Sequence, residues 1–425
     1  MKILWVVNSI LPEIAVANHL PPATGAGWLS GILHGLQTYT AGAKILVCFP
    51  FCGRKLVGEA GNFSYESFYE KSNFKKEKRA KQELREIFLR EKPDLIHIFG
   101  TEYPHALSAM EVACELGKAD QTLINVQGLI SVCARHYEAG LPPRVVHACT
   151  LRDFLKLDNI AGQKRKFEKR GNFEIAAIRQ AKHIIGRTDW DKACILRLNS
   201  DIQYYKCYET LRSSFYEGEW KRENCEPYSV FVSQYNYSLK GFHVVLEAFS
   251  DLVKKYPTSR LYTTGPSLDE VCSLRNLKHK TYYSVYLKKL VARYGLQKHV
   301  VFLGSLDAEG MKRQLLKSNA FVLPSSVENS SNSLGEAMLL GLPCIASDVG
   351  GVRTFVRHEE DGLLYPFDEP YMLASYLDRI FSESVLAERL GTNAKKSATP
   401  KFDPKNNAET LFDIYRSILQ ASVEI

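Results

Sequence analysis

The stretch covering residues 320–356 constrains the fold more than any other part of the sequence. It contains two short apolar runs without polar alternation, at 320–323 and 344–346. Such runs are typical of strands buried on both faces of a parallel sheet. Between them lie a loop rich in Ser and Asn and an apolar helical segment that Gly341 and Pro343 are expected to end. The stretch therefore predicts a strand–loop–helix–strand unit of an α/β fold.

The start of the predicted helix is a candidate binding site. We expect Asn332 or Ser333 to cap the helix, whose free backbone N–H groups favour phosphate oxygens. Glu328 and Glu336 bracket this point in the sequence, and a carboxylate accepts hydrogen bonds from the neighbouring hydroxyls of a ribose or hexose. In the simpler alternative, Glu336 only complements the helix dipole.

A longer motif adds a resemblance to these observations. The sequence E-x7-E, followed by A-M-x-x-G-x-P-x-I-A-S-x-x-G-G, resembles the C-terminal signature of family-four retaining glycosyltransferases, over residues 320–381. The resemblance implies an α/β fold of the GT-B class, in which two Rossmann-like domains with parallel sheets face each other across a cleft. The expected parts are an N-terminal acceptor-binding domain (1–222), a nucleotide-sugar-binding domain (223–404) and a C-terminal helix that crosses back to the first domain (405–425).

The resemblance also implies roles for residues in the second half. Lys240 matches the family's lysine on the donor diphosphate, whereas Gln234 stands where the family usually has an arginine. Gly265 matches a glycine turn beneath the nucleobase. We assign catalytic roles to Glu328 and Lys240. The expected donor-binding residues are Glu336, Gln234, Gly265, Asn329, Asn332, Ser333, Leu334, Gly27 and Gln127.

Residues of the first half are expected on the acceptor side. Gly25 and Gly27 precede a helix predicted over 28–40, either as part of a ligand pocket or as a plain glycine turn. His105 follows the strand predicted over 95–99, where open α/β sheets bind ligands, or is a surface histidine. Gln127 replaces a histidine that family members often have, and Arg135 either supplies the missing charge or is simply solvated.

Composition narrows the remaining classes. The 425 residues are 45% hydrophobic and 24% charged, with a formal net charge of +8, which suits a protein with two α/β domains. The ten cysteines include no C-x-x-C pair and no cluster with His at zinc spacing, so we expect reduced thiols and no metal site. Neither a signal peptide nor a membrane span is expected, which favours a cytoplasmic protein.

Two basic segments, at 152–192 and 278–296, allow different interpretations. The first is either a solvated helix face or a patch for anionic lipid headgroups on the inner face of the cytoplasmic membrane. The second is a basic helical stretch to which the sequence assigns no role. Nucleic acid is not an expected partner, because no reader motif interleaves aromatic and basic residues.

The family resemblance, together with these observations, implies a retaining, metal-independent hexosyltransferase. Its donor would be a nucleotide-diphosphate sugar, with no further cofactor, and its acceptor a lipid-linked glycan in polysaccharide biosynthesis. The alternative is a non-catalytic nucleotide-sugar-binding or regulatory protein with the same fold, because Gln127 and Gln234 both replace cationic residues.

Overall fold

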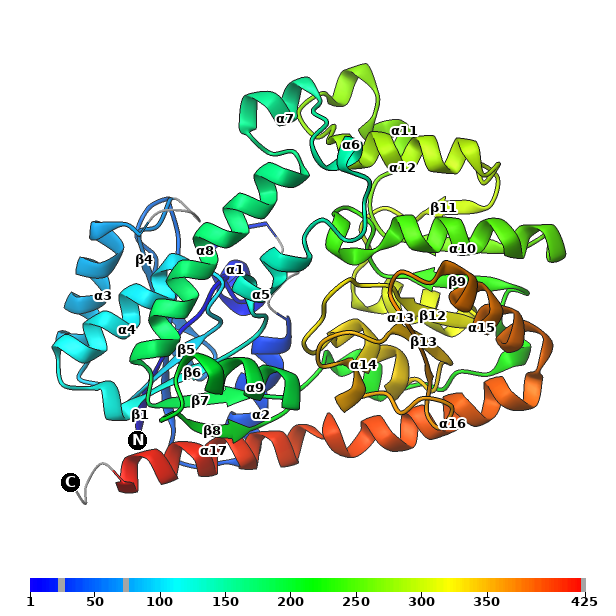
Figure 1. Cartoon of the computed structure of the whole chain (residues 1–425). Coiled ribbons are helices and arrows are strands. Elements are labelled where there is room, and N and C mark those ends of the chain that lie inside the picture. Colours follow the sequence, from blue (N-terminus) through cyan, green and yellow to red (C-terminus); the bar gives the residue numbers. More distant parts are fainter. Residues whose placement is uncertain (22–26, 72–75, 422–425) are drawn as a thin grey trace. The chain divides into compact units, whose positions relative to one another are not determined.

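The computed structural model describes residues 1–21, 27–71 and 76–421 (Figure 1). The chain forms two compact units, each made from separate pieces of sequence. The first contains residues 1–132, 166–211 and 401–425, and the second contains residues 133–165 and 212–400. The sequence analysis expected domain boundaries after residues 222 and 404. In the structure, the corresponding changes of unit come after residues 211 and 400.

The first unit contains an eight-stranded sheet in the order β3-β4-β2-β1-β5-β6-β7-β8. All neighbouring strands are parallel except β3, which runs antiparallel to β4. The strands are β1 (Lys2–Val6), β2 (Lys44–Pro50), β3 (Val57–Ala60), β4 (Phe63–Phe68), β5 (Leu95–Phe99), β6 (Thr122–Asn125), β7 (His183–Gly186) and β8 (Gln203–Lys206). The strand that the sequence predicts over 95–99 corresponds to β5.

Helices cover both faces of this sheet, which explains why its central strands are apolar throughout. One core includes side chains of α2 and α17 and the other includes side chains of α3, α4, α8 and α9. The helices of the unit are α1 (Pro12–Ala17), α2 (Gly27–Tyr39), α3 (Lys78–Glu91), α4 (Pro104–Glu115), α5 (Ile130–Cys133), most of α8 (Ile160–Gln180), α9 (Asp189–Leu198) and α17 (Pro404–Ala421).

His97 is a histidine of the hydrophobic core in the first unit. Its side chain lies fully buried in β5, and its Nδ1 is 2.7 Å from the hydroxyl of Tyr415 on α17. Burial lowers the pKa of His97 well below its usual value. The contact fastens the C-terminal helix to the centre of the first sheet.

The second unit contains a six-stranded, entirely parallel sheet in the order β11-β10-β9-β12-β13-β14. Its strands are β9 (Ser229–Val232), β10 (Arg260–Thr263), β11 (Val300–Phe302), β12 (Ala320–Leu323), β13 (Cys344–Ser347) and β14 (Leu363–Tyr365). Its helices are α6 (Pro143–Val146), α7 (Leu151–Lys156), α10 (Phe242–Lys255), α11 (Leu268–Val271), α12 (Tyr282–Arg293), α13 (Ala308–Lys317), α14 (Asn332–Leu339), α15 (Pro370–Ser382) and α16 (Ser384–Lys401). The predicted α/β fold with two parallel-sheet domains is confirmed.

The basic segment 152–192 is not one helix. The chain leaves α7 at Leu157, whose φ of 48° lies in the left-handed region, and α8 begins only at Ile160. Strand β7 follows α8, and residues 133–165 belong to the second unit. The charge pattern did not reveal this change of unit, because the helix propensities of the basic residues are similar on both sides of it.

Two general findings concern the described part of the chain. None of its helices combines the length and apolar character that crossing a membrane requires. All ten cysteines lie in described regions, and each is a free thiol.

Candidate functional site

The segment between β12 and α14 forms the centre of the candidate site in the second unit. Ser331 caps α14, because its backbone is extended and its Oγ accepts a hydrogen bond from Leu334 N at 3.4 Å. The expected cap at Asn332 or Ser333 is therefore wrong by one or two residues. The hydroxyl of Ser333 instead lies 3.2 Å from that of Ser233, just after β9. The two strand ends thus meet at the start of the helix.

Lys240 and Glu328 form an ion pair beside this helix end. Lys240 Nζ donates to Glu328 Oε2 at 2.9 Å, and Ser325 Oγ donates to the same oxygen at 3.0 Å. Both charged side chains keep some exposure. Burial by itself would lower the pKa of Lys240, but the Glu328 carboxylate raises it above the usual range. Lys240 is therefore a fixed positive charge at the carboxyl end of the sheet.

Two glycines allow other backbone segments to hold the loop that carries Glu328. A Cβ atom at Gly241 would lie 1.8 Å from the carbonyl oxygen of Pro324, and one at Gly350 would lie 2.1 Å from that of Glu328. Both glycines have positive φ, 63° and 53°. Gly351 N also donates to Glu328 O at 2.9 Å. The Gly350-Gly351 pair thus brings its backbone close to that of Glu328.

Glu336 is buried and bound by an arginine that the sequence analysis did not single out. Arg212 Nε and Nη2 donate to its two carboxylate oxygens at 2.6 and 2.7 Å. Burial raises the pKa of Glu336, and Arg212 opposes that shift. Arg212 lies 124 residues away in the sequence, just before a short 3₁₀ helix (Ser213–Tyr216). No local motif connects the two positions.

Other residues expected at the donor site are close to these groups in the sequence, and they differ in how far they are buried. Asn329 and Leu334 are buried. The side-chain oxygen of Asn332 is also buried, and none of the described residues donates to it. A buried acceptor of this kind is rare in a folded protein unless a water or ligand supplies the missing hydrogen bond. Gln234 is exposed after β9, where it adds no charge.

Gly265 forms a turn at the end of β10. Its φ is 105°, and its N–H and C=O pair with Gly304, at 2.7 and 3.0 Å. A Cβ atom here would lie 2.9 Å from the ring of Tyr235. The turn therefore packs an aromatic ring beneath the ends of β9 and β10. Burial raises the pKa of Tyr235 to about 12, so the ring is neutral.

In the first unit, His105 is neither a surface histidine nor freely accessible. It is buried, with Nδ1 2.6 Å from Glu70 Oε2 and Nε2 2.8 Å from Asn8 Oδ1. Asn8 Nδ2 in turn donates to Glu102 at 2.9 Å, and Glu102 accepts from Gly128 N. Both His105 nitrogens are therefore occupied, and the residue positions Asn8 and Glu102 at the strand ends.

The remaining predicted residues are distributed as follows. Gly27 is the first residue of α2, and Gly25 lies outside the described residues. Gln127 follows β6, and its amide donates to Asn125 Oδ1 at 2.9 Å. Arg135 is exposed in a 3₁₀ turn (Ala134–His136) of the second unit, whereas Gln127 belongs to the first.

Glu174 is a buried acid of the first unit, and the sequence analysis did not indicate it. Its carboxylate accepts hydrogen bonds from Thr101, Ile130 and Ser131 at the ends of β5 and β6. Burial raises its pKa to about 7, against the effect of these hydrogen bonds. Glu174 lies in the middle of a basic helix, where the sequence pattern indicates only a solvated face. Over the described residues, no group of three or more His, Cys, Asp or Glu side chains is arranged to hold a metal ion.

Comparison with known proteins agrees with this geometry. Residues 215–397 match the family model for glycosyl transferases group 1. An uncharacterized glycosyltransferase of Methanocaldococcus jannaschii is 31% identical over 136 residues, 32% of this chain and 35% of that protein. Spore coat protein SA of Bacillus subtilis is 27% identical over 180 residues, 42% of this chain and 45% of that protein. The chain spans less than half the length of these curated relatives.

Solved structures share the fold over nearly the whole chain. Sucrose-phosphate synthase from Thermosynechococcus elongatus superposes with a TM-score of 0.73 at 18% identity, covering 99% of this chain and 100% of that one. HepE of Anabaena, solved in complex with UDP-glucose, gives 0.67 at 15% identity, covering 98% and 100%. The chain has the GT-B fold, and its second unit resembles group 1 glycosyltransferases.

Proposed function

We propose that the chain is a retaining hexosyltransferase that uses a nucleotide-diphosphate sugar as donor. The arrangement that carries the proposal is the Lys240–Glu328 pair at the N-terminal end of α14, with Glu336 one turn into that helix. It combines a fixed cation, free helical N–H groups and two carboxylates at the carboxyl ends of parallel strands. These are the groups that a diphosphate and sugar hydroxyls require. The family match over residues 215–397 supports the same conclusion.

In the proposed complex, Lys240 and the start of α14 bind the diphosphate. The Lys240 ammonium has three donors, and one of them is used by Glu328. Glu336 accepts hydrogen bonds from the ribose hydroxyls alongside Arg212. Glu328 accepts from the donor sugar through Oε1, because Lys240 and Ser325 both bind Oε2.

Transfer breaks the bond between the anomeric carbon and the diphosphate oxygen, and forms a bond to the acceptor oxygen on the same face. The acceptor proton passes to the leaving phosphate. Positive charge develops on the sugar and negative charge on the diphosphate, so preorganised groups of opposite sign lower the barrier. Lys240 and α14 would stabilise the leaving group, and Glu328 the sugar. We further propose that the reaction needs no metal and that the acceptor is a lipid-linked glycan of polysaccharide assembly, handled at the cytoplasmic face of the membrane.

The first experiment is a thermal-shift screen of nucleotide sugars with and without EDTA. A ligand that binds the folded state raises the melting temperature by mass action. One donor that stabilises the wild type but not Glu336→Ala, followed by transfer to a lipid-linked acceptor with the anomeric configuration retained, would support the proposal. Donor binding that EDTA abolishes would contradict metal independence.

A non-catalytic nucleotide-sugar-binding protein is the second candidate. The observation that favours it is the exposed Gln234 at the end of β9. Because glutamine is neutral, it adds no positive charge to that of Lys240 at the predicted diphosphate site. Donor hydrolysis without acceptor separates the two functions. A bound donor that is neither hydrolysed nor transferred to any glycan acceptor would establish the binding protein.

A further inference from the structure

The short helix α7 of the second unit has its polarity reversed. A helix on a protein surface normally buries its apolar side chains and exposes its polar ones. In α7, Leu151, Phe154 and Leu155 are 68%, 68% and 72% exposed, and Leu157, just after the helix, is 69% exposed. The acid of the same helix, Asp153, is only 1% exposed. The apolar face of α7 therefore points to solvent.

Polar bonds on the inner side fix this orientation. Thr150 and Asp153 form a capping box at the start of α7, and Asp153 Oδ2 also accepts from Tyr282 N at 2.7 Å, the first residue of α12. Thr150 Oγ1 donates to Lys280 O at 2.8 Å. One buried carboxylate thus caps two helices at once, which ties α7 to the segment before α12.

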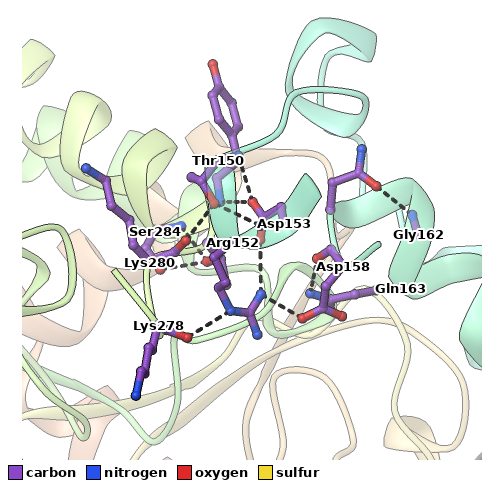
Figure 2. Close-up of polar contacts among 12 residues, drawn as sticks. Thr150, Arg152, Asp153, Asp158, Gly162, Gln163, Lys278, Lys280 and Ser284 are labelled. Atoms are coloured by element: carbon purple, nitrogen blue, oxygen red, sulfur yellow. Dashed lines mark hydrogen bonds and ion pairs between the residues drawn. The ribbon is translucent and has the colours of Figure 1, made fainter. Parts of the chain in front are cut away.

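Arg152 completes the attachment, as Figure 2 shows. Its Nε donates to Lys278 O at 3.2 Å, and its Nη1 lies 3.0 Å from Asp153 Oδ1 and 2.6 Å from Asp158 Oδ2. Rotating α7 to bury its leucines would break these bonds and turn Arg152 and Asp153 toward solvent. The outward apolar face is therefore built into the local hydrogen bonding.

The segment beside α7 extends the apolar surface. Leu277 is 46% exposed, and a groove of about 490 Å³ separates α7 from residues 277–285. Its apolar lining comes from both sides, namely Leu151, Leu155, Leu277 and Val285.

Positive charge surrounds this apolar surface. Lys156, Lys278 and Lys280 line the groove together with its leucines. The acids of the same segment, Asp153 and Asp158, are both paired with Arg152. A surface of this composition matches an anionic layer with an apolar interior, because lysine stems lie along apolar groups while their ammonium groups reach phosphates.

We propose that α7, Leu157 and residues 277–280 form a docking surface for an anionic lipid bilayer. Leu151, Phe154, Leu155 and Leu157 enter the boundary between headgroups and acyl chains, and the three lysines contact lipid phosphates. The attraction combines burial of apolar area with electrostatics, as for other interfacial helices. The surface contains none of the donor-site residues, so it can be tested whether or not the proposed transferase function holds.

The test is flotation of the full-length chain with vesicles of phosphatidylcholine, with and without phosphatidylglycerol. We expect the wild type to float with the anionic vesicles. Phe154→Ser/Leu155→Ser should lower the partition coefficient about tenfold or more, because two apolar side chains that would be buried in the bilayer are removed. Lys156→Glu/Lys278→Glu should lower it on anionic vesicles by a similar factor. The matched control is Tyr371→Ser/Val385→Ser, which replaces exposed apolar residues of α15 and α16 and should float like the wild type.

Circular dichroism and the melting temperature establish that each variant is folded. A wild type that stays unbound on anionic vesicles overturns the proposal, as does a Phe154→Ser/Leu155→Ser variant that floats normally. Light scattering detects the competing occupant, a second copy of the chain. A dimer that these substitutions dissociate, without vesicle binding by the wild type, also overturns it. Donor-induced stabilisation, measured in the same samples, reports separately on the proposed function.

Discussion

Arg212 binds both oxygens of the buried Glu336 carboxylate, at 2.6 and 2.7 Å. The two parallel bonds have the fork geometry that makes arginine–carboxylate pairs strong and directional. Arg212 thereby opposes the rise in the pKa of Glu336 that burial causes. Two of the lone pairs of Glu336 are used in this way, and the others remain for a ligand.

Replacing Arg212 with alanine should therefore destabilise the fold and change the pH dependence of donor binding. Removing one partner of a buried pair costs about 3 kcal/mol, and we expect somewhat less because Arg212 keeps some exposure. The pKa of Glu336 is already raised by burial and should rise further. Donor affinity of Arg212→Ala should then weaken as the pH is lowered toward 6, while the wild type changes less. Urea unfolding and donor titrations at several pH values measure both effects. An unchanged unfolding free energy would show that the pair contributes nothing.

Glu328→Gln should lower turnover more than donor binding. The substitution keeps the shape of the side chain but removes the charge beside the developing oxocarbenium ion, so we expect kcat to fall about 10-fold to 100-fold with little change in donor Kd. Glu309→Gln, on the exposed first turn of α13, is the control. Equal kcat values for Glu328→Gln and the wild type would exclude the assigned role.

Gln234→Arg should strengthen donor binding. A guanidinium at this exposed position adds a charge-assisted contact to a diphosphate, worth about tenfold in affinity. Isothermal titration with the donor and with the matching nucleoside monophosphate distinguishes a diphosphate effect from general attraction. Asn236→Arg, two residues further on and also exposed, is the matched control. An identical gain in both variants would mean that only net charge matters.

Gly350→Ala should displace the loop that carries Glu328. The new methyl group would lie 2.1 Å from the Glu328 carbonyl oxygen, in addition to the strain of a φ of 53°. Gly295→Ala has the same type of strain at φ 68°, but no atom lies within 4 Å of its added methyl group. Gly295→Ala should therefore lose only about 1 kcal/mol of stability and keep its turnover, whereas Gly350→Ala should lose most of its activity. Similar kinetics for the two variants would contradict the close-contact argument.

Glu174 should make the first unit less stable as the pH rises. Its pKa is raised by burial to about 7, above the value of about 4.3 expected in the unfolded chain. The folded state therefore holds a proton that the unfolded state releases, and the stabilising contribution is complete below pH 4 and lost as the pH rises through 7. The full change is at most about 4 kcal/mol. Urea unfolding of the wild type and Glu174→Gln between pH 5 and 8 should show a smaller slope for the variant. Parallel slopes would contradict the assignment.

The sequence predicts strands such as β5 and β12 well because they are largely apolar runs. The ranges expected for these two strands agree with the structure to the residue. The β3–β4 pair escaped prediction because its strands contain Gly58, Glu59, Ser64 and Glu66, which weakens any apolar pattern. One of these polar side chains, Glu66, is buried only because Lys55 and Arg90 neutralise it.

The candidate site was predictable where its residues lie within one motif. Glu328, Glu336 and the glycine pair lie within 24 residues of each other in the sequence, and Lys240 was found through the family resemblance. Arg212 was missed, because nothing in the sequence near it specifies a partner 124 residues away. The inner location of His105 was missed for the same reason, since Glu70 and Asn8 come from two other strand ends.

The division of the chain has a consequence for how the protein is made. Residues 133–165 are separated from the rest of their unit by a piece of the other, and α17 supplies Tyr415 to the core of a unit whose first strand begins at Lys2. During synthesis, neither unit has all its parts when the ribosome passes a domain boundary. The second unit must wait for residues near 400, and the first for α17 itself.

The order of completion is therefore the reverse of the order of synthesis. The nascent first sheet has one face without Leu411, Ile414, Tyr415 and Ile418 until α17 has been translated. A stop codon just before α17 would leave this apolar face open. Loss of α17 should thus be detected as aggregation or proteolysis of the first unit. This effect would arise although α17 is distant in sequence from the candidate donor-site residues.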